Sequence, residues 1–92
     1  MCRIYKKPVL DLEATGKRIK TLRVSSMLSV KQIQSVFNFE HPQAVYNWES
    51  GKSLPSVDNL LVLADLFGVR MDEIVVYRTV EVECDLDARK SA

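Results

Sequence analysis

Histidine and cysteine are scarce in this 92-residue sequence, which has one histidine and two cysteines. Zinc sites use Cys and His at close spacing, but Cys2 and Cys84 lie near opposite ends and His41 has no such neighbour. A single histidine also restricts acid–base catalysis, and the sequence has neither a Ser/His/Asp set nor a phosphate-binding loop. We therefore expect no enzyme activity, no metal, no cofactor and no small-molecule ligand.

Long apolar runs are also missing. No stretch approaches the roughly 18 uninterrupted apolar residues that a membrane span needs. The first residues are charged but are not followed by the apolar segment of a signal peptide. We therefore expect a cytoplasmic protein without membrane contact, in which both cysteines stay reduced. A chain of this length, with 47% hydrophobic and 27% charged residues, has room for one globular core.

No strong net charge marks the chain as a whole, because 13 basic residues oppose 12 acidic ones. Their distribution is uneven. Residues 1–55 have nine basic and four acidic residues, a net +5, and residues 56–92 have four basic and eight acidic ones, a net −4. This asymmetry is expected when one face of a protein meets phosphate, and a chance imbalance between two solvated surfaces is the alternative.

Capping residues and apolar spacing predict two helices in the first half of the chain. Asp11 is a suitable N-cap for a helix that runs to about Val24. Ser29 and Gln32 have the spacing of a capping box, in which each residue satisfies a backbone N–H of the other. This box predicts a second helix that ends near residues 37–38.

Three further helices are expected in residues 42–75. Pro42 suits the first position of a helix over 42–50, because its missing N–H costs nothing there, and Gly51 ends it. A fourth helix, capped by Ser56, precedes Gly68, and a short fifth one spans about 71–75. In the fourth helix these apolar residues are expected to face the core: Val57, Leu60, Leu61, Leu63, Ala64 and Phe67.

Two segments near the chain ends have the composition of strands. Residues 3–6 form a possible short strand or arm, and residues 75–83 are β-branched and alternate in polarity. The expected organisation is an N-terminal arm or short strand over 1–10, a helical domain over 11–75, and a strand with a polar tail over 76–92. The second strand has two possible partners, which are the first strand of its own chain or a copy across a two-fold axis.

The expected third helix is unusually polar. Amphipathic core helices place three or four apolar residues in two turns, but this helix has only Val45 and Trp48 as strong anchors. Gln43 and Asn47 lie among the remaining positions, and Gln and Asn are side chains that bond bidentately to adenine in the major groove. A polar helix after a short capped helix and a turn is typical of a helix-turn-helix.

From Gly16 to Val75 the sequence resembles the phage repressor and Cro type of helix-turn-helix domain, also called Xre-type. The resemblance lies in four runs: Gly16-x-x-Ile19-x-x-Leu22-Arg23, Leu28-Ser29-Val30-x-x-Ile33, Val45-x-x-Trp48-Glu49-x-Gly51-Lys52-x-x-Pro55-Ser56, and Leu60-x-x-Leu63-Ala64-x-x-Phe67-Gly68-Val69. It implies a mainly α fold, a five-helix lambda-repressor-like helix-turn-helix domain with short flanking β-strands at the N- and C-termini. It also implies sequence-specific binding of double-stranded DNA by a small transcriptional regulator or repressor.

The resemblance assigns roles to individual residues. The family's base-reading positions correspond to Gln43, Ala44, Tyr46, Asn47 and, at the N-cap, His41. The DNA phosphate contacts are expected at Lys52, Ser53, Lys31 and Ser29. Arg23 and Glu49 match an ion pair that ties the first helix to the end of the recognition helix. His41 as a simple surface cap and Tyr46 packed on the scaffold are the alternatives for these two residues.

The sequence departs from the family pattern at three points. The turn before the expected third helix is one residue longer than usual, at Glu40 and His41. Pro42 occupies a position that is often a polar base reader, and Val30 stands where the family usually has a phosphate-contacting Gln. A homodimer on two half-sites is the expected DNA-bound form, because one such domain buries little DNA surface. The alternative function is a protein-interaction module, such as an antitoxin that binds a partner protein, with DNA binding secondary.

Overall fold

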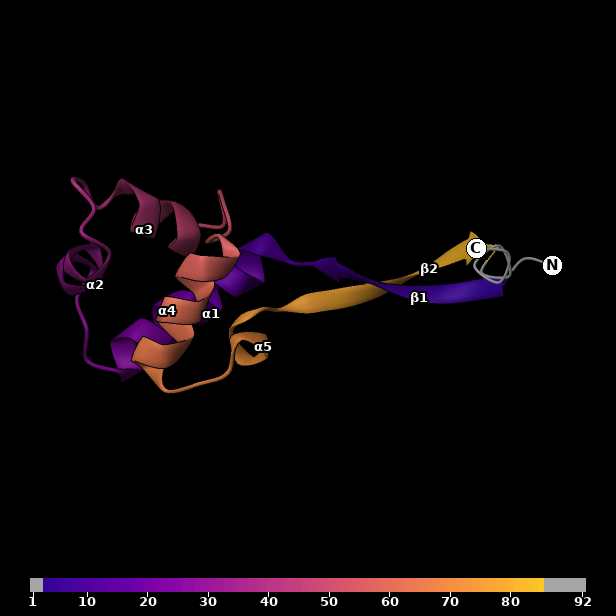
Figure 1. Cartoon of the computed structure of the whole chain (residues 1–92). Helices are drawn as coiled ribbons and strands as arrows, with labels where there is room; N and C mark the ends of the chain where they lie inside the picture. The colour runs from indigo at the N-terminus through magenta and orange to yellow at the C-terminus, as the bar shows by residue number, and fades with distance from the viewer. Residues whose placement is uncertain (1–2, 86–92) are drawn as a thin grey trace.

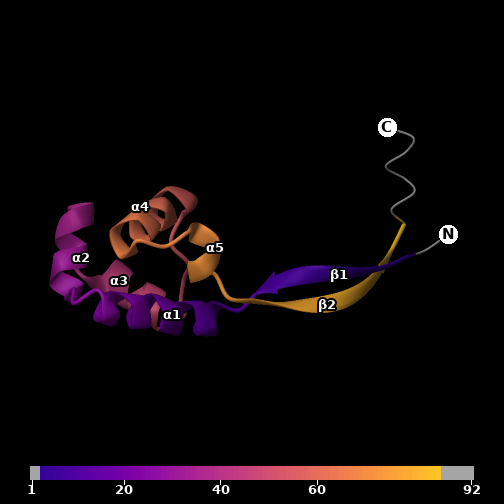
Figure 2. The ribbon, with the colours of Figure 1, turned by 90° about the horizontal axis from the view of Figure 1, so that it is seen from below.

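A computed structural model describes residues 3–85 and shows a bundle of helices from which a two-stranded ribbon projects (Figure 1). The elements follow in the order β1 Arg3–Leu10, α1 Leu12–Ser25, α2 Val30–Phe37, α3 Gln43–Glu49, α4 Val57–Phe67, α5 Met71–Ile74 and β2 Tyr77–Cys84. We call residues 11–76 the helical body and β1 with β2 the ribbon. The molecule measures 53 × 24 × 23 Å, and its long dimension runs along the ribbon (Figure 2). Within residues 3–85, none of the helices has the length and apolar character required to span a bilayer.

The caps of α1 and α2 confirm the predicted helix starts. The Asp11 carboxylate accepts a hydrogen bond from the Ala14 N–H at 3.0 Å. At α2, the Ser29 hydroxyl accepts from the Gln32 N–H, and the Gln32 side chain accepts from the Ser29 N–H. Both caps use side chains only three residues apart, so the local sequence is sufficient to define them.

The start of α3 corrects one prediction. The helix begins at Gln43, and Pro42 is its N-cap instead of its first residue, so His41 lies outside the helix. No side chain caps this end. Proline locks φ near the helical value and is therefore compatible with either position, so its presence does not distinguish the N-cap from the first helical residue.

The apolar face of α4 also differs from its prediction. Leu60, Leu63 and Ala64 are buried as expected, but Val57 is 75% exposed and Leu61 is 59% exposed. Val57 and Leu61 are four residues apart and share one helix face. That face of α4 points to solvent, because the other faces already supply the core.

The core of the helical body joins all five helices. Its buried apolar residues are Ile19, Ile33, Val45, Trp48, Leu60, Leu63, Ala64 and Ile74. Around Trp48 the rings of Phe37 and Phe39 stack at 5.2 Å, and both meet the indole edge-on at 5.4 and 5.9 Å. This aromatic cluster fixes α3 against the end of α2.

Within the chain, the second strand pairs with the first, which is one of the two partners that the sequence left open. β1 and β2 are antiparallel, in a register that runs from Arg3 opposite Cys84 to Leu10 opposite Tyr77. β1 is longer than expected and continues through Pro8, which an edge strand tolerates. Cys84 is a free thiol. Cys2 and residues 86–92 of the expected polar tail lie outside the described residues.

Thr15 connects the helical body to the ribbon. Its buried hydroxyl accepts a hydrogen bond from the Val76 N–H at 2.9 Å and donates to the Val76 carbonyl at 3.2 Å. The Asp11 N–H also donates to that carbonyl, at 2.9 Å. The first turn of α1 thus holds the residue that precedes β2.

Candidate nucleic-acid interface

The two sides of α3 have different chemistry. Val45 and Trp48 are buried in the core, whereas Gln43 and Tyr46 are exposed and Asn47 is half-buried. The Gln43 side-chain amide donates to the Asn47 side-chain oxygen at 3.0 Å. The core anchors therefore hold the helix with two linked amide side chains on its outer side.

A hollow of about 440 Å³ lies between this side of α3, α1 and the loop after α3. We call it the α3 hollow. Its lining residues are Lys20, Arg23, Gln43, Tyr46, Asn47, Glu49, Ser50 and Lys52. Lys20 and Lys52 are both exposed, so two ammonium groups flank the amides. This combination of cations and amides can bond to anions and to polar base edges.

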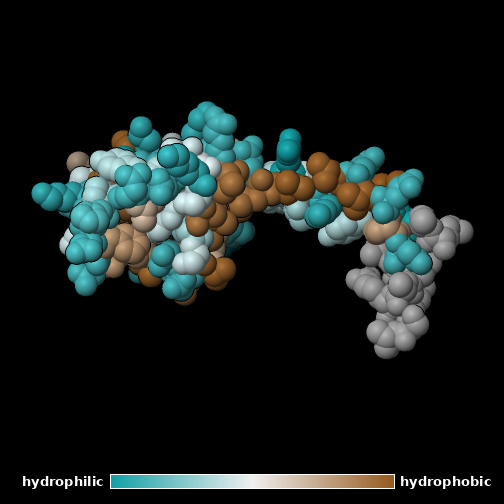
Figure 3. Space-filling view, turned by 90° about the horizontal axis from the view of Figure 1, so that it is seen from above, coloured by the Kyte–Doolittle hydropathy of each residue, from teal (hydrophilic) through white to brown (hydrophobic). Residues whose placement is uncertain are grey.

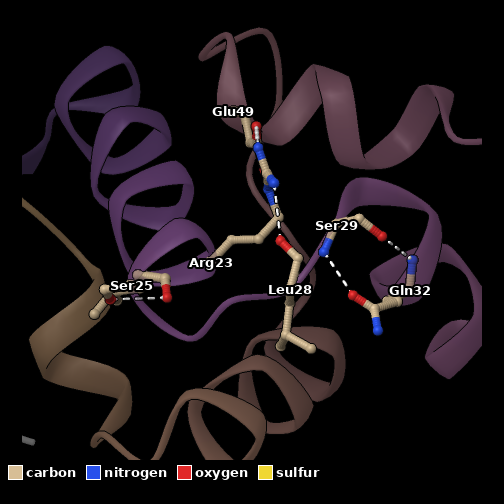
Figure 4. A network of polar contacts seen from close by, with 7 residues as sticks. Arg23, Ser25, Leu28, Ser29, Gln32 and Glu49 are labelled. Atoms are coloured by element: carbon tan, nitrogen blue, oxygen red, sulfur yellow. Dashed lines mark hydrogen bonds and ion pairs between the residues drawn. The ribbon is translucent and has the colours of Figure 1, made fainter.

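An ion pair between Arg23 and Glu49 ties α1 to the end of α3 (Figure 4). Arg23 Nε and Nη2 donate to the two oxygens of Glu49 at 2.6 and 3.2 Å, and Nη1 donates to the Leu28 carbonyl at 3.0 Å. The two side chains are only 13% and 8% exposed. The hydrogen bond to Glu49 raises the pKa of Arg23, so the guanidinium stays charged. A bidentate pair fixes the orientation as well as the distance of the two helices.

Gly16 allows α1 to approach the end of α3 closely. A Cβ at this position would lie 2.5 Å from the Trp48 carbonyl oxygen and 2.7 Å from that of Glu49. Because both contacts involve backbone, a side chain here would push the two helices apart. Glycine at position 16 therefore has a packing role in positioning α3.

The helix-turn-helix family model matches residues 19–74, more than half of the chain. The chain belongs to the helix-turn-helix family. The predicted Xre-type resemblance and the predicted mainly α fold, with five helices and strands at both ends, are confirmed. In this helix-turn-helix chain the match includes α2 and α3, and the α3 hollow lies on the outer side of α3.

Solved structures share this helix-turn-helix fold. The restriction-modification controller protein C.AhdI from Aeromonas hydrophila is 26% identical, with a TM-score of 0.62 over 70% of this chain and 96% of its own. The S. venezulae BldD DNA-binding domain is 23% identical, with a TM-score of 0.59 over 71% of this chain and 96% of its own. A comparison with curated protein sequences found no match.

The structure brings some of the expected site residues together and separates others. Gln43, Tyr46, Asn47 and Lys52 all line the α3 hollow. Ser53 is exposed directly after them, and its N–H donates to the Asn47 carbonyl at 3.3 Å.

The other expected contacts lie outside the α3 hollow. Ala44 is half-buried and packs against the core, so only part of it faces outward. His41 is exposed before Pro42, and the Ser29 hydroxyl is engaged in the α2 cap. Lys31 lines a different hollow, on α2. The group on α3 and its following loop is therefore the coherent part of the expected site.

Lys20 is a member of the α3 hollow that the sequence analysis missed. The helical spacing of α1 places it away from the core, and the expected site did not include it. Lys20 lies three residues before Arg23, however, and residues at this spacing share a helix face. Since Arg23 was already expected to reach the end of α3, the spacing contained the signal that could have placed Lys20 beside it. Within residues 3–85, no group of His, Cys, Asp and Glu is arranged to hold a metal.

Proposed function

We propose that this protein is a cytoplasmic transcription regulator that binds double-stranded DNA in a sequence-specific manner. It acts by binding and not by catalysis. α3 enters the major groove, and two copies bind two half-sites. The observation that supports this proposal most directly is the pair of amide side chains, Gln43 and Asn47, on the outer side of a helix that is anchored by Val45 and Trp48.

The amides supply the base-reading part of the proposal. Glutamine and asparagine can pair bidentately with the N6 and N7 positions of adenine. The hydrogen bond between Gln43 and Asn47 restrains both side chains before DNA arrives. Less side-chain freedom is then lost on binding, which favours affinity for a matching site.

The lysines supply the phosphate-binding part. Lys20 and Lys52 come from α1 and from the loop after α3, so they flank the reading side of α3 from two elements. Contacts of this kind release counterions from DNA and make the affinity fall as salt increases. Residues 1–55 have a net charge of +5, and a positive charge is what binding to phosphate requires.

The half-site arrangement follows from size. A single small DNA-binding module buries roughly 600–1,000 Å² of protein surface, and two modules on half-sites about 34 Å apart read a longer sequence. The fold is shared with a domain described as DNA-binding and with a restriction-modification controller. Because both proteins are distant relatives, they support the class of function that we propose and not a particular target sequence.

The first test is a salt titration of binding to a fluorescent random-sequence duplex, together with selection from a site library. We expect binding that weakens steeply with salt and an enriched sequence with two-fold symmetry. No binding at low salt would contradict the proposal and would favour the protein-interaction module instead.

Two substitutions separate base reading from phosphate contact. Gln43→Ala should reduce discrimination at one position of each half-site by about 1–3 kcal/mol. Lys52→Ala should weaken binding to all sequences alike and lower the salt slope by about one. Lys17→Ala is the matched control, because Lys17 lies on α1, does not line the α3 hollow and pairs with Glu13. Unchanged sequence preference in the Gln43 variant would place the reading side chains elsewhere.

A further inference from the structure

The ribbon extends away from the helical body (Figure 2), and among residues 3–85 each of its strands has one edge without a neighbouring strand. A two-stranded ribbon is marginally stable on its own, and three or more strands with an apolar face are needed for independent stability. We propose that the free edge of β2 pairs with β2 of a second copy, so that two ribbons form one four-stranded antiparallel sheet. The inference deepens the proposed function, because it names the surface that joins the two copies.

The two free edges differ in a way that selects β2. β1 has Pro8, Lys6 and Lys7, and both proline and lysine are residues that protect an edge from further pairing. Over residues 77–84, β2 has neither proline nor lysine, and its Thr79 and Val80 favour extended pairing. β2 carries Arg78, Glu81 and Glu83 instead, so the edge of β1, with its proline and two lysines, is the better protected of the two.

The backbone of β2 is oriented for this pairing. Proline has no N–H, so Pro8 fits the sheet with its nitrogen side turned away from β2. Thr79 lies directly opposite Pro8. In an antiparallel ladder such a pair exchanges no hydrogen bonds, so the N–H and C=O of Thr79 also face outward. By alternation Glu81 and Glu83 do the same, and they offer a second strand a regular row of donors and acceptors.

One face of the ribbon is apolar and basic. The register places Tyr5, Val9, Val80 and Val82 on the same face, and Lys7 and Arg78 lie between them. Apolar residues can be seen along the ribbon in Figure 3. Packing two such faces against each other would bring the cations of both copies together, which disfavours a face-to-face dimer. Edge pairing keeps these cations in water.

The charges of β2 also allow a two-fold register. If Val80 lies opposite its own counterpart, then Thr79 lies opposite Glu81, and Arg78 lies opposite Val82. No like charges are then directly opposite within residues 77–83. A register centred on Glu81 would instead place two carboxylates face to face, and like charges at such positions destabilise a sheet. The register centred on Val80 is therefore the one that we assign.

The exposed face of α4 is the competing surface. Val57 and Leu61 are apolar and exposed there. Asp58 and Asp65 flank Leu61 at helical spacing and are both exposed, so a symmetric contact between two α4 helices would bring carboxylates of both copies together. The β2 edge carries no such obstacle in its assigned register.

Two proline substitutions at directly opposed positions test the edge. Glu81→Pro removes an outward N–H from β2, and Lys6→Pro removes one from β1, since Lys6 and Glu81 face each other in the register. Sedimentation should show a dimer for the wild type and for the Lys6 variant. We expect the dimer dissociation constant to rise by about 10-fold or more for Glu81→Pro. Equal losses in both variants, a monomeric wild type, or loss of the dimer in Leu61→Lys with retention in Glu81→Pro would overturn the proposal.

A cross-linking experiment tests the register. In the assigned register, the positions of the two Val80 residues form a non-hydrogen-bonded pair, with Cα atoms about 4.5 Å apart, which a disulfide can span. In a background with Cys2→Ser and Cys84→Ser, Val80→Cys should cross-link under mild oxidation at least about 10-fold faster than Val82→Cys, because the two Val82 positions are separated by four strand residues, roughly 13 Å. Equal rates in the two variants would overturn the register.

The outcomes are separable from those of the proposed function. Binding to duplex DNA by a wild type that stays monomeric would reject the β2 interface and leave the DNA-binding proposal intact. A dimer that is weakened by Glu81→Pro but binds no duplex at low salt would reject the DNA-binding proposal and leave the β2 interface intact.

Discussion

The helical body and the ribbon are held together by different kinds of contact. The body has eight buried apolar side chains and an aromatic cluster around Trp48. In the ribbon, by contrast, the described side chains are all exposed or half-buried. The body therefore supplies its own stability, whereas the ribbon depends on its backbone ladder, on the Thr15 connection and, by our proposal, on a second copy. This difference suits a molecule in which one part must be rigid and the other is a surface for association.

The largest effect is expected at a buried isoleucine of the helical body. Ile33 is 1% exposed in the body, and Ile4 is 59% exposed in the ribbon. Ile33→Ala should lower the free energy of unfolding by about 2–5 kcal/mol, because a buried side chain leaves a cavity. Ile4→Ala should change it by about 0.5 kcal/mol or less. Urea unfolding followed by circular dichroism measures both, and equal losses would show that the ribbon has a core of its own.

The ion pair of the body should have the next largest effect. Glu49→Ala leaves Arg23 charged and mostly buried, and we expect a loss of about 2–4 kcal/mol, slightly below the cost for a fully buried pair. Glu13→Ala is the control, because Glu13 meets Lys17 at 3.6 Å on the surface. Its effect should be about 0.5 kcal/mol or less. A similar result for the two variants in urea unfolding would mean that the Arg23 pair does not fix α3.

A smaller effect is expected at the connection between the two regions. Thr15→Val keeps the shape of the side chain but leaves the Val76 N–H without its partner, which should cost about 1–3 kcal/mol. Hydrogen exchange should accelerate at Val76 and along the ribbon more than in α2. Thr21→Val, at an exposed position of α1, is the control. Uniform acceleration across the body would show that Thr15 stabilises the core and not the connection.

The smallest expected effect depends on pH. The Ser56 hydroxyl donates to Asp58 at 2.5 Å, and this hydrogen bond lowers the pKa of Asp58. A folded-state pKa below the unfolded value of about 3.9 means that the carboxylate stabilises the fold above this pH and loses that effect as the pH falls through the folded pKa. Ser56→Ala should therefore move the midpoint of acid unfolding slightly upward. Ser35→Ala, an exposed serine of α2, should leave the midpoint unchanged.

The parts of the fold that could be predicted are those with local causes. Asp11 and Ser29 cap helices through contacts three residues away, so the sequence was sufficient. The pairing of β1 with β2 joins the two ends of the chain, and no local pattern distinguishes it from pairing with a second copy. The exposure of Val57 and Leu61 also depends on which face of α4 the other helices cover, and spacing alone does not determine that face.

The site shows the same division between local and distant causes. The polarity of α3 identified Gln43 and Asn47, because the lack of apolar residues is visible in the sequence itself. Lys20 was missed because it joins them from another helix, through the contact between α1 and α3. The spacing of Lys20 from Arg23 predicts its place beside α3 only when it is combined with the pairing of Arg23 with Glu49 at the end of α3.

The register of the ribbon also determines when it can form. Its paired residues are separated by 67 to 81 positions in the chain, from Leu10 with Tyr77 to Arg3 with Cys84. Contacts at such separations form slowly in a free chain, because a long loop must close first. Once α1 holds Val76, the first pair is already adjacent, and the strands can then zip outward. Because all five helices lie between β1 and β2 in the chain, β1 stays without its partner on the ribosome until the helical body has been synthesised, so the ribbon forms after the helices that separate its strands have been made.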